Sequence, residues 1–154
     1  MAVGKPMRYK TFLQLRDEQE YRDHFKQHYV LSSPILTFDS IAVSFKLTHH
    51  IEILRKEPAP GQLRAFCPQR AERLDWIKAG LQDPNANLYF GYDRKRKTVD
   101  YNRRVAIVAA NYAIIIRMTA QKTAEFVTAY IMDERSLKLA TRHPDWNETD
   151  CVWS

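Results

Sequence analysis

The segment Phe45–Lys56, with the sequence FKLTHHIEILRK, carries the residues best suited to chemistry: two adjacent histidines and several cations. Histidine has an unperturbed pKa of about 6.5, so its ring can accept or donate a proton near neutral pH. Lys46 precedes His49 by three residues, a spacing at which two side chains meet on one face of a helix. The pair therefore predicts a proton-transfer group with a positive charge beside it.

The element that must position these residues is expected to be a helix from Asp39 to about Lys56, because Asp39 is a good N-cap and prolines follow Lys56. With about 100° between successive residues, the expected core stripe consists of Val43, Leu47, Ile51 and Leu54. His50 lies at the edge of this stripe and is expected to be packed and hydrogen-bonded. His49 points away from the stripe, and both catalysis and a plain surface position stay open for it.

Metal and cofactor sites are not indicated by the sequence. His24 and His28 have the i,i+4 spacing of a helical ligand pair, but no Glu lies between them as in an HExxH motif, and no third ligand is evident. Such a pair more often marks a solvated helix face. Cys67 and Cys151 belong to no CxxC pair, and 4 glycines are too few for a phosphate-binding glycine loop. We expect no metal and no cofactor.

The charge of the chain favours a polyanionic partner. The net charge is +6, from 24 Lys and Arg against 18 Asp and Glu. Aromatic residues lie next to two basic clusters, and this combination suits RNA, whose bases stack on aromatic rings while cations neutralise its phosphates. A charged turn in solvent is the plainer alternative. The predicted RNA-binding residues are Arg94, Lys95, Arg96, Lys97, Arg103 and Arg104.

The first half of the chain reads as helical. The segment DEQEYRDHFKQHY begins with acids and ends with basic residues, as the helix dipole favours, and Tyr21, Phe25 and Tyr29 form an apolar stripe. After the helix around His49, a third helix opens at Pro68 in PQRAERLDWIKAGLQ. Residues 1–16 form an N-terminal extension and residues 142–154 an irregular tail, within a single domain of residues 1–154.

The second half is rich in β-branched and aromatic residues, in the runs ANLYFGY, RRVAIVA, YAIIIRMT and EFVTAYIM. Only short links separate these runs, so the strands should be antiparallel. The predicted fold is α+β, with two or three N-terminal helices packed on a four-stranded antiparallel sheet. Strict alternation along the last run would put Phe126, Thr128 and Tyr130 on one face.

The order of these parts resembles the superfamily of barnase, EndoU, colicin D and RelE-like nucleases (BECR), in its phage-associated or colicin D-like branch. The likeness covers Tyr21 to Met132 and rests on KLTHH, on RLDWIKAGLQDPNANLYFGY and on the final FVTAY. In the colicin D branch, a helical lysine and a histidine three residues later face a hydroxyl residue and an aromatic residue on a strand. The corresponding residues are Lys46, His49, Thr128 and Tyr130, with Thr in place of Ser and Tyr in place of Trp.

This resemblance implies metal-independent cleavage of RNA, often tRNA, by attack of a 2′-hydroxyl on the neighbouring phosphorus. His49 would move the proton, while Lys46 and Arg117 would stabilise charge on the phosphorus oxygens. Thr128 would bind a phosphate oxygen and Tyr130 would stack on a base. A toxin-like or phage-associated effector of this kind would need an acidic immunity or antitoxin protein.

Two other functions stay open: an RNA-binding module without catalysis, and a structural or interaction protein whose charge is incidental. The N-terminus MAVGKPMRYK lacks an apolar signal core, and no apolar run reaches the roughly 20 residues of a membrane helix. We therefore expect a cytoplasmic protein that is not embedded in a membrane.

Overall fold

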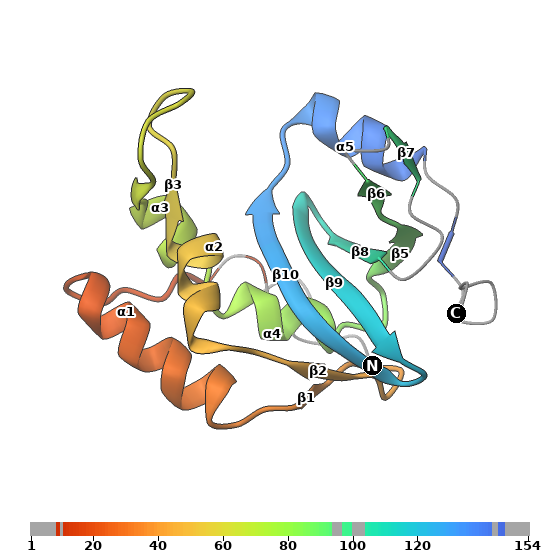
Figure 1. Cartoon of the computed structure of the whole chain (residues 1–154), viewed down its shortest axis with the longest axis horizontal. Coiled ribbons are helices and arrows are strands. Elements are labelled where there is room, and N and C mark those ends of the chain that lie inside the picture. The colour runs from red at the N-terminus through yellow and green to blue at the C-terminus, as the bar shows by residue number, and fades with distance from the viewer. Residues whose placement is uncertain (1–8, 10, 94–96, 100–103, 143–144, 147–154) are drawn as a thin grey trace.

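The computed structural model describes residues 9, 11–93, 97–99, 104–142 and 145–146. The fold is α+β, as the sequence predicts, but its sheet has six strands in the order β1-β2-β10-β9-β8-β5. In Figure 1, α1, α2 and α3 lie together at one side of this sheet, and α5 lies beyond the end of β10. Four of the predicted RNA-binding residues, Arg94, Lys95, Arg96 and Arg103, lie outside the described residues.

The predicted helices occur in the expected order but in shorter pieces: α1 (Glu18–Phe25), the π-helical turn η2 (Lys26–Val30), the 3-10 turn η3 (Leu47–His49), α2 (His50–Leu54), α3 (Pro68–Ala71) and α4 (Trp76–Leu81). A further helix, α5 (Glu134–Thr141), was not predicted. The predicted stripe on the first helix is confirmed, because its three aromatic residues are buried. Asp17 caps this helix by accepting a hydrogen bond from the backbone N–H of Glu20 across 2.9 Å.

The sheet contains all four predicted strands: β5 (Asn87–Phe90), β8 (Arg104–Ala109), β9 (Tyr112–Ala120) and β10 (Thr123–Ile131). Where these four pair with one another they are antiparallel, as expected. Four short strands form two further pairs outside this sheet: β3 (Arg55–Lys56) with β4 (Ala65–Phe66), and β6 (Tyr92–Asp93) with β7 (Thr98–Val99).

Two strands of the six-stranded sheet were not predicted, β1 (Ile35–Leu36) and β2 (Ala42–Ser44), and β2 pairs with β10 in parallel. The prediction of an exclusively antiparallel, four-stranded sheet is therefore wrong, and so is the prediction of one helix from Asp39 to Lys56. The physical reason is visible in the burial of Ile41, Val43 and Phe45, which alternates with period two as in a strand. This layout departs from the one that the family resemblance implied.

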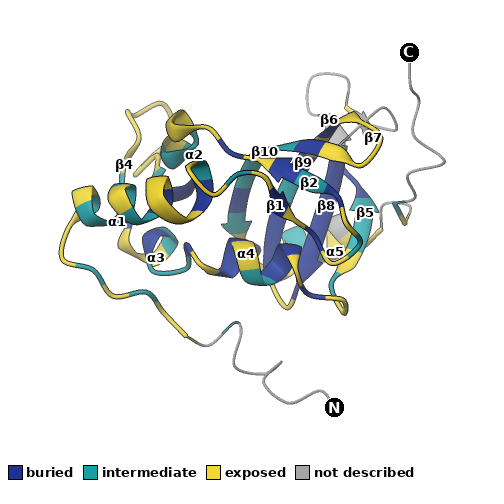
Figure 2. Ribbon diagram, turned by 90° about the horizontal axis from the view of Figure 1, so that it is seen from below, coloured by how far each residue is buried: buried dark blue, intermediate teal, exposed yellow. Residues whose placement is uncertain are grey.

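The main core fills the space between α1, α4 and one face of the sheet, which we call the inner face. Trp76 and Ile77 of α4 pack there with Ile114 and Ile116 of β9. The buried residues shown in Figure 2 are concentrated in β8, β9 and β10 and on the side of α4 that meets them. A smaller cluster on the opposite, outer face joins β8, β9 and β10 to Leu137 of α5.

Both ends of the described chain pack against the domain. In the N-terminal extension, the carbonyl of Thr11 accepts a hydrogen bond from the indole of Trp76 across 2.8 Å. The helix α5 ends just before the predicted tail of residues 142–154, and within that tail the backbone N–H of Trp146 donates to the carbonyl of Leu88 across 2.9 Å. None of the helices within the described ranges is both long and apolar enough to cross a membrane.

Candidate functional site

His49 is the last residue of the 3-10 turn η3. Its ring forms a hydrogen bond with the backbone of Lys46, the residue that precedes the turn. The backbone N–H of Lys46 donates a hydrogen bond to Nδ1 of His49 across 3.0 Å. Because Nδ1 serves as an acceptor, the neutral ring carries its proton on Nε2. The nitrogen available to a ligand is therefore an N–H donor, while Nδ1 is already used by the backbone.

The surroundings of His49 favour the neutral ring. Burial lowers the pKa of this histidine, and the charge of Lys46 acts in the same direction, whereas Glu125 and Glu52 oppose it. The ring is half-buried and meets the ring of Phe126 edge-on, with 5.3 Å between centroids. The expectation that His49 lies off the core is thus only partly correct, because one side of the ring packs against β10.

The expected core stripe is confirmed only at Val43 and Leu54, which are buried. Leu47 and Ile51 are exposed, and the buried residues of α2 are Ile53 and Leu54. The helix begins at His50 instead of Asp39. Its buried face therefore consists of other residues than those expected. His50 is partly buried as expected, but its Nδ1 is enclosed with no hydrogen-bond partner in the described part of the chain, so the expected hydrogen bonding is not found at this atom.

Strand β10 contains a bulge that changes which side chains share a face. Phe126 pairs with Ile116 and Thr128 with Ile115, so Val127 is an extra residue. Phe126 belongs to the main core on the inner face, whereas Tyr130 packs in the small outer cluster. The prediction that Phe126, Thr128 and Tyr130 share one face is therefore wrong for Phe126.

A row of charged residues crosses the outer face. Nη2 of Arg117 lies 2.8 Å from Oε1 of Glu125 on the neighbouring strand, and 50% and 27% of these side chains are exposed. Arg104 lies opposite Arg117 in the register of β8 and β9, and Ser44 lies opposite Glu125. Arg117 was predicted as catalytic and Arg104 as RNA-binding, and the register puts both in this charged row.

The predicted catalytic residues thus fall into two groups. Arg117, Thr128 and Tyr130 belong to the outer face, since Thr128 precedes the inner-facing Ala129 and Tyr130 packs in the outer cluster. His49 and Lys46 lie where β2 ends, and His49 touches Phe126 of the inner face. The expected cleft between one helix and one sheet face, holding all four residues of the family pattern, is not supported by this arrangement.

Glu125 connects the two groups and was missed by the sequence analysis. Its charge acts on His49, and its carboxylate pairs with Arg117. A single glutamate in a strand has no spacing signal of its own. Counting outward from the turn between β9 and β10 would have placed it opposite Met118, and the register shift after Thr123 puts it opposite Arg117 instead. The candidate site therefore consists of Lys46, His49, Arg117, Glu125, Thr128 and Tyr130.

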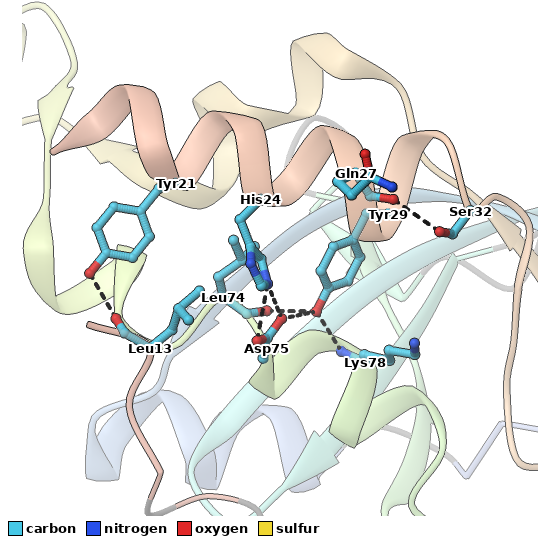
Figure 3. Close-up of polar contacts among 9 residues, drawn as sticks. All are labelled: Leu13, Tyr21, His24, Gln27, Tyr29, Ser32, Leu74, Asp75 and Lys78. Carbon is cyan, nitrogen blue, oxygen red and sulfur yellow. Dashed lines mark hydrogen bonds and ion pairs between the residues drawn. The ribbon is translucent and has the colours of Figure 1, made fainter. Parts of the chain in front are cut away.

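The histidine pair of α1 has a structural role instead. Nε2 of His24 lies 3.0 Å from Oδ1 of Asp75, the residue before α4. The hydroxyl of Tyr29 donates to the same oxygen across 3.2 Å (Figure 3). Burial acts to raise the pKa of Asp75, but the contacts with His24 and Tyr29 outweigh it and hold the pKa below its usual value. This network fastens α1 and η2 to the start of α4.

Within the described ranges, no three or more His, Cys, Asp or Glu residues are grouped so that they could hold a metal ion. Of the predicted RNA-binding residues that are described, Lys97 is exposed in the turn between β6 and β7. Comparison with known proteins finds no matching family model, no similar curated protein and no similar solved structure. The resemblance to the BECR nucleases therefore stays a prediction.

Proposed function

We propose that this protein is an endoribonuclease that cleaves RNA by attack of a 2′-hydroxyl, without a metal, at the charged row on the outer face. The observation that carries this proposal is the ion pair of Glu125 with Arg117, directly next to Phe126, whose ring meets that of His49 edge-on. A hydrogen-bond donor, a carboxylate that accepts a proton and two cations are the groups that this reaction uses near one phosphate. A toxin-like or phage-associated effector that acts on tRNA or another structured RNA remains our proposal for the biological role.

The roles follow from the atoms that each residue presents. Glu125 takes the proton of the 2′-hydroxyl while the 2′-oxygen forms a bond to phosphorus. Nε2–H of His49 donates to a phosphorus oxygen, because Nδ1 is held by Lys46 and leaves only the donor free. Lys46 and Arg117 stabilise the added negative charge. The bond from phosphorus to the 5′-oxygen breaks, and that oxygen takes a proton from solvent.

The two remaining residues bind the substrate. Thr128 is partly exposed on the outer face and its hydroxyl can donate to a phosphate oxygen. Tyr130 presents a partly exposed ring on which a base can stack. Both lie on the same strand as Glu125, beyond the bulge at Val127.

The experiment is incubation of the protein with total RNA and with purified tRNA in the presence of EDTA, followed by mapping of both product ends. The mechanism gives a cyclic 2′,3′-phosphate and a 5′-hydroxyl. Products with a 5′-phosphate, or cleavage that disappears with EDTA, would contradict it, because both indicate a metal-activated water.

A second function, RNA binding without cleavage, is favoured by one specific observation. The hydrogen bond from Lys46 to Nδ1 gives His49 a structural task in closing η3, which requires no catalysis. On this alternative, RNA binding would fall steeply with salt, since cations displace counterions from phosphates, and the RNA would stay intact.

A further inference from the structure

A cavity of about 550 Å³ lies at the end of the sheet, away from the charged row. It is bounded by α5, by the turn between β8 and β9, and by the loop before β5. Its lining includes Asp83, Asn85, Asn87, Val108, Leu137 and Lys138. A volume of this size falls in the range of small-molecule sites.

The chemistry of the lining suits a flat, uncharged ligand with a polar edge. Val108 and Leu137 offer apolar surface, while Asn85 and Asn87 are exposed amides that both donate and accept hydrogen bonds. Asp83 is only 6% exposed and accepts from the hydroxyl of Tyr9 across 2.9 Å. Its other oxygen accepts from the backbone N–H of Asn85 across 2.9 Å, so a further donor would have to use a second lone pair of one of these oxygens, while the buried negative charge opposes a bare anion. Lys138 alone supplies a cation in this lining, and it already lies 3.5 Å from Glu134.

The cavity lies on the same outer face as the candidate site. A second row of paired residues, distinct from the charged row, connects the two. Asn87 pairs with Val108, Val108 with Ala113, and Ala113 with Tyr130, so one row of the sheet leads from the cavity to the proposed stacking residue. Val108, Leu137 and Tyr130 also belong to the same outer cluster. On β8, Arg104 and Val108 are four residues apart, which is about 13 Å in a strand. A single RNA strand laid on the outer face covers that distance in a few nucleotides.

We propose that this cavity binds an adenine base of the RNA, a few nucleotides from the bond that is cut. An asparagine amide pairs with N6 and N7 of adenine through two hydrogen bonds, and the exocyclic amine is a donor of the kind that a carboxylate accepts. The assignment to RNA rests on the proposed function, whereas adenine binding in the cavity does not require cleavage. The structure thus separates a base-recognition position from the reaction site.

The binding test uses adenosine, AMP, uridine and inorganic phosphate as probes, with backbone amide shifts of the folded protein as the readout. Adenosine and AMP should shift the amides of Asn85, Asn87 and Lys138, and uridine should shift them much less. Asn87→Ala should weaken adenosine binding by about tenfold or more, the usual effect of losing a bidentate base contact. Gln121→Ala is the matched control, because Gln121 is exposed in the turn at the other end of β9.

Thr141→Trp provides a second variant, since Thr141 lines the cavity on the exposed side of α5 and a larger side chain there blocks entry. The proposal predicts loss of adenosine shifts in this variant with an unchanged melting temperature. Equal shifts by adenosine and uridine would overturn it, as would shifts by phosphate alone or unaltered binding in both variants. Adenosine binding with no RNA cleavage would retain the base site and refute the nuclease. Cleavage that does not respond to Asn87→Ala, together with no adenosine shifts, would retain the nuclease and refute the base site.

Discussion

Lys46 and His49 are joined by two hydrogen bonds across the start of η3. The N–H of Lys46 donates to Nδ1 of His49, and the N–H of His49 donates to the carbonyl of Lys46, each across 3.0 Å. The first bond fixes the ring and determines which nitrogen can meet a substrate. Nδ1 of His49 therefore serves the structure of the turn, and Nε2 is the nitrogen that can meet a substrate. Substitutions can separate these two roles.

His49→Asn is expected to abolish most cleavage while preserving the fold. The amide oxygen of asparagine can accept from Lys46 in place of Nδ1, but the variant has no counterpart of Nε2–H. Loss of one donor to a phosphorus oxygen should lower kcat about 10²–10³-fold. Single-turnover cleavage and urea unfolding are the measurements. His49→Ala is the comparison, which should lose similar activity and in addition some stability, because the turn then lacks its acceptor. Full activity in His49→Asn would show that Nε2 has no part in the reaction.

Glu125→Gln should remove activity with little change in stability. The ion pair with Arg117 is partly exposed, and such pairs contribute about 0–1 kcal/mol. Loss of the proton acceptor should reduce kcat by about 10²–10⁴-fold, the usual contribution of general base catalysis. Glu134→Gln is a matched control, because Glu134 is an exposed glutamate on α5 with its own cation nearby. Equal cleavage by the two variants would remove Glu125 from the mechanism.

Phe126→Ala should destabilise the protein by about 3–5 kcal/mol, the usual cost of emptying a buried aromatic position. Phe126 is 1% exposed and packs against Phe45, with 5.0 Å between ring centroids. Val127→Ala should cost much less, since the bulge residue is only partly buried. Chemical denaturation of the two variants tests the position of the bulge. A larger cost for Val127 would mean that the strand is shifted by one residue.

Stability should decrease as the pH falls below about 6.5, the ordinary histidine pKa. Burial lowers the pKa of both His49 and His50 in the folded protein. Below 6.5 the unfolded chain therefore binds more protons than the folded one, and the free energy of unfolding drops until the lowered pKa values are passed. Urea unfolding at pH 7.5 and 5.5 measures the difference. The double variant His49→Asn, His50→Gln should show a smaller decrease, and an unchanged pH dependence would contradict this origin.

The strands β5, β8, β9 and β10 of the main sheet could be predicted because their runs of β-branched and aromatic residues are separated by short links. The stretch from Ile41 to Phe45 carried a strand signal as well, since every second residue is apolar and buried. The two histidines and the acid at Asp39 nevertheless favoured a helical interpretation of the whole segment. The helix α5 had a capping signal in Asp133, whose side chain accepts from the N–H of Ser136 across 2.7 Å.

The site was predictable only in part, because its arrangement depends on pairing between strands. The bulge at Val127 reverses the side on which later residues lie, and nothing in FVTAY distinguishes it from a regular strand. Glu125 gains its significance from Arg117, which lies eight positions earlier and becomes its neighbour through the hairpin. The role of Nδ1 in closing η3 depends likewise on where the helix begins.

The most direct test of the central claim is cleavage of an RNA oligonucleotide that carries a single 2′-deoxynucleotide on the 5′ side of the mapped cleavage position. If the 2′-hydroxyl is the nucleophile, the unmodified RNA is cut in EDTA and the substituted bond stays intact, while binding of both RNAs is similar. Cleavage of the substituted bond at an undiminished rate would contradict the proposed mechanism, since the attacking oxygen would then have to come from elsewhere.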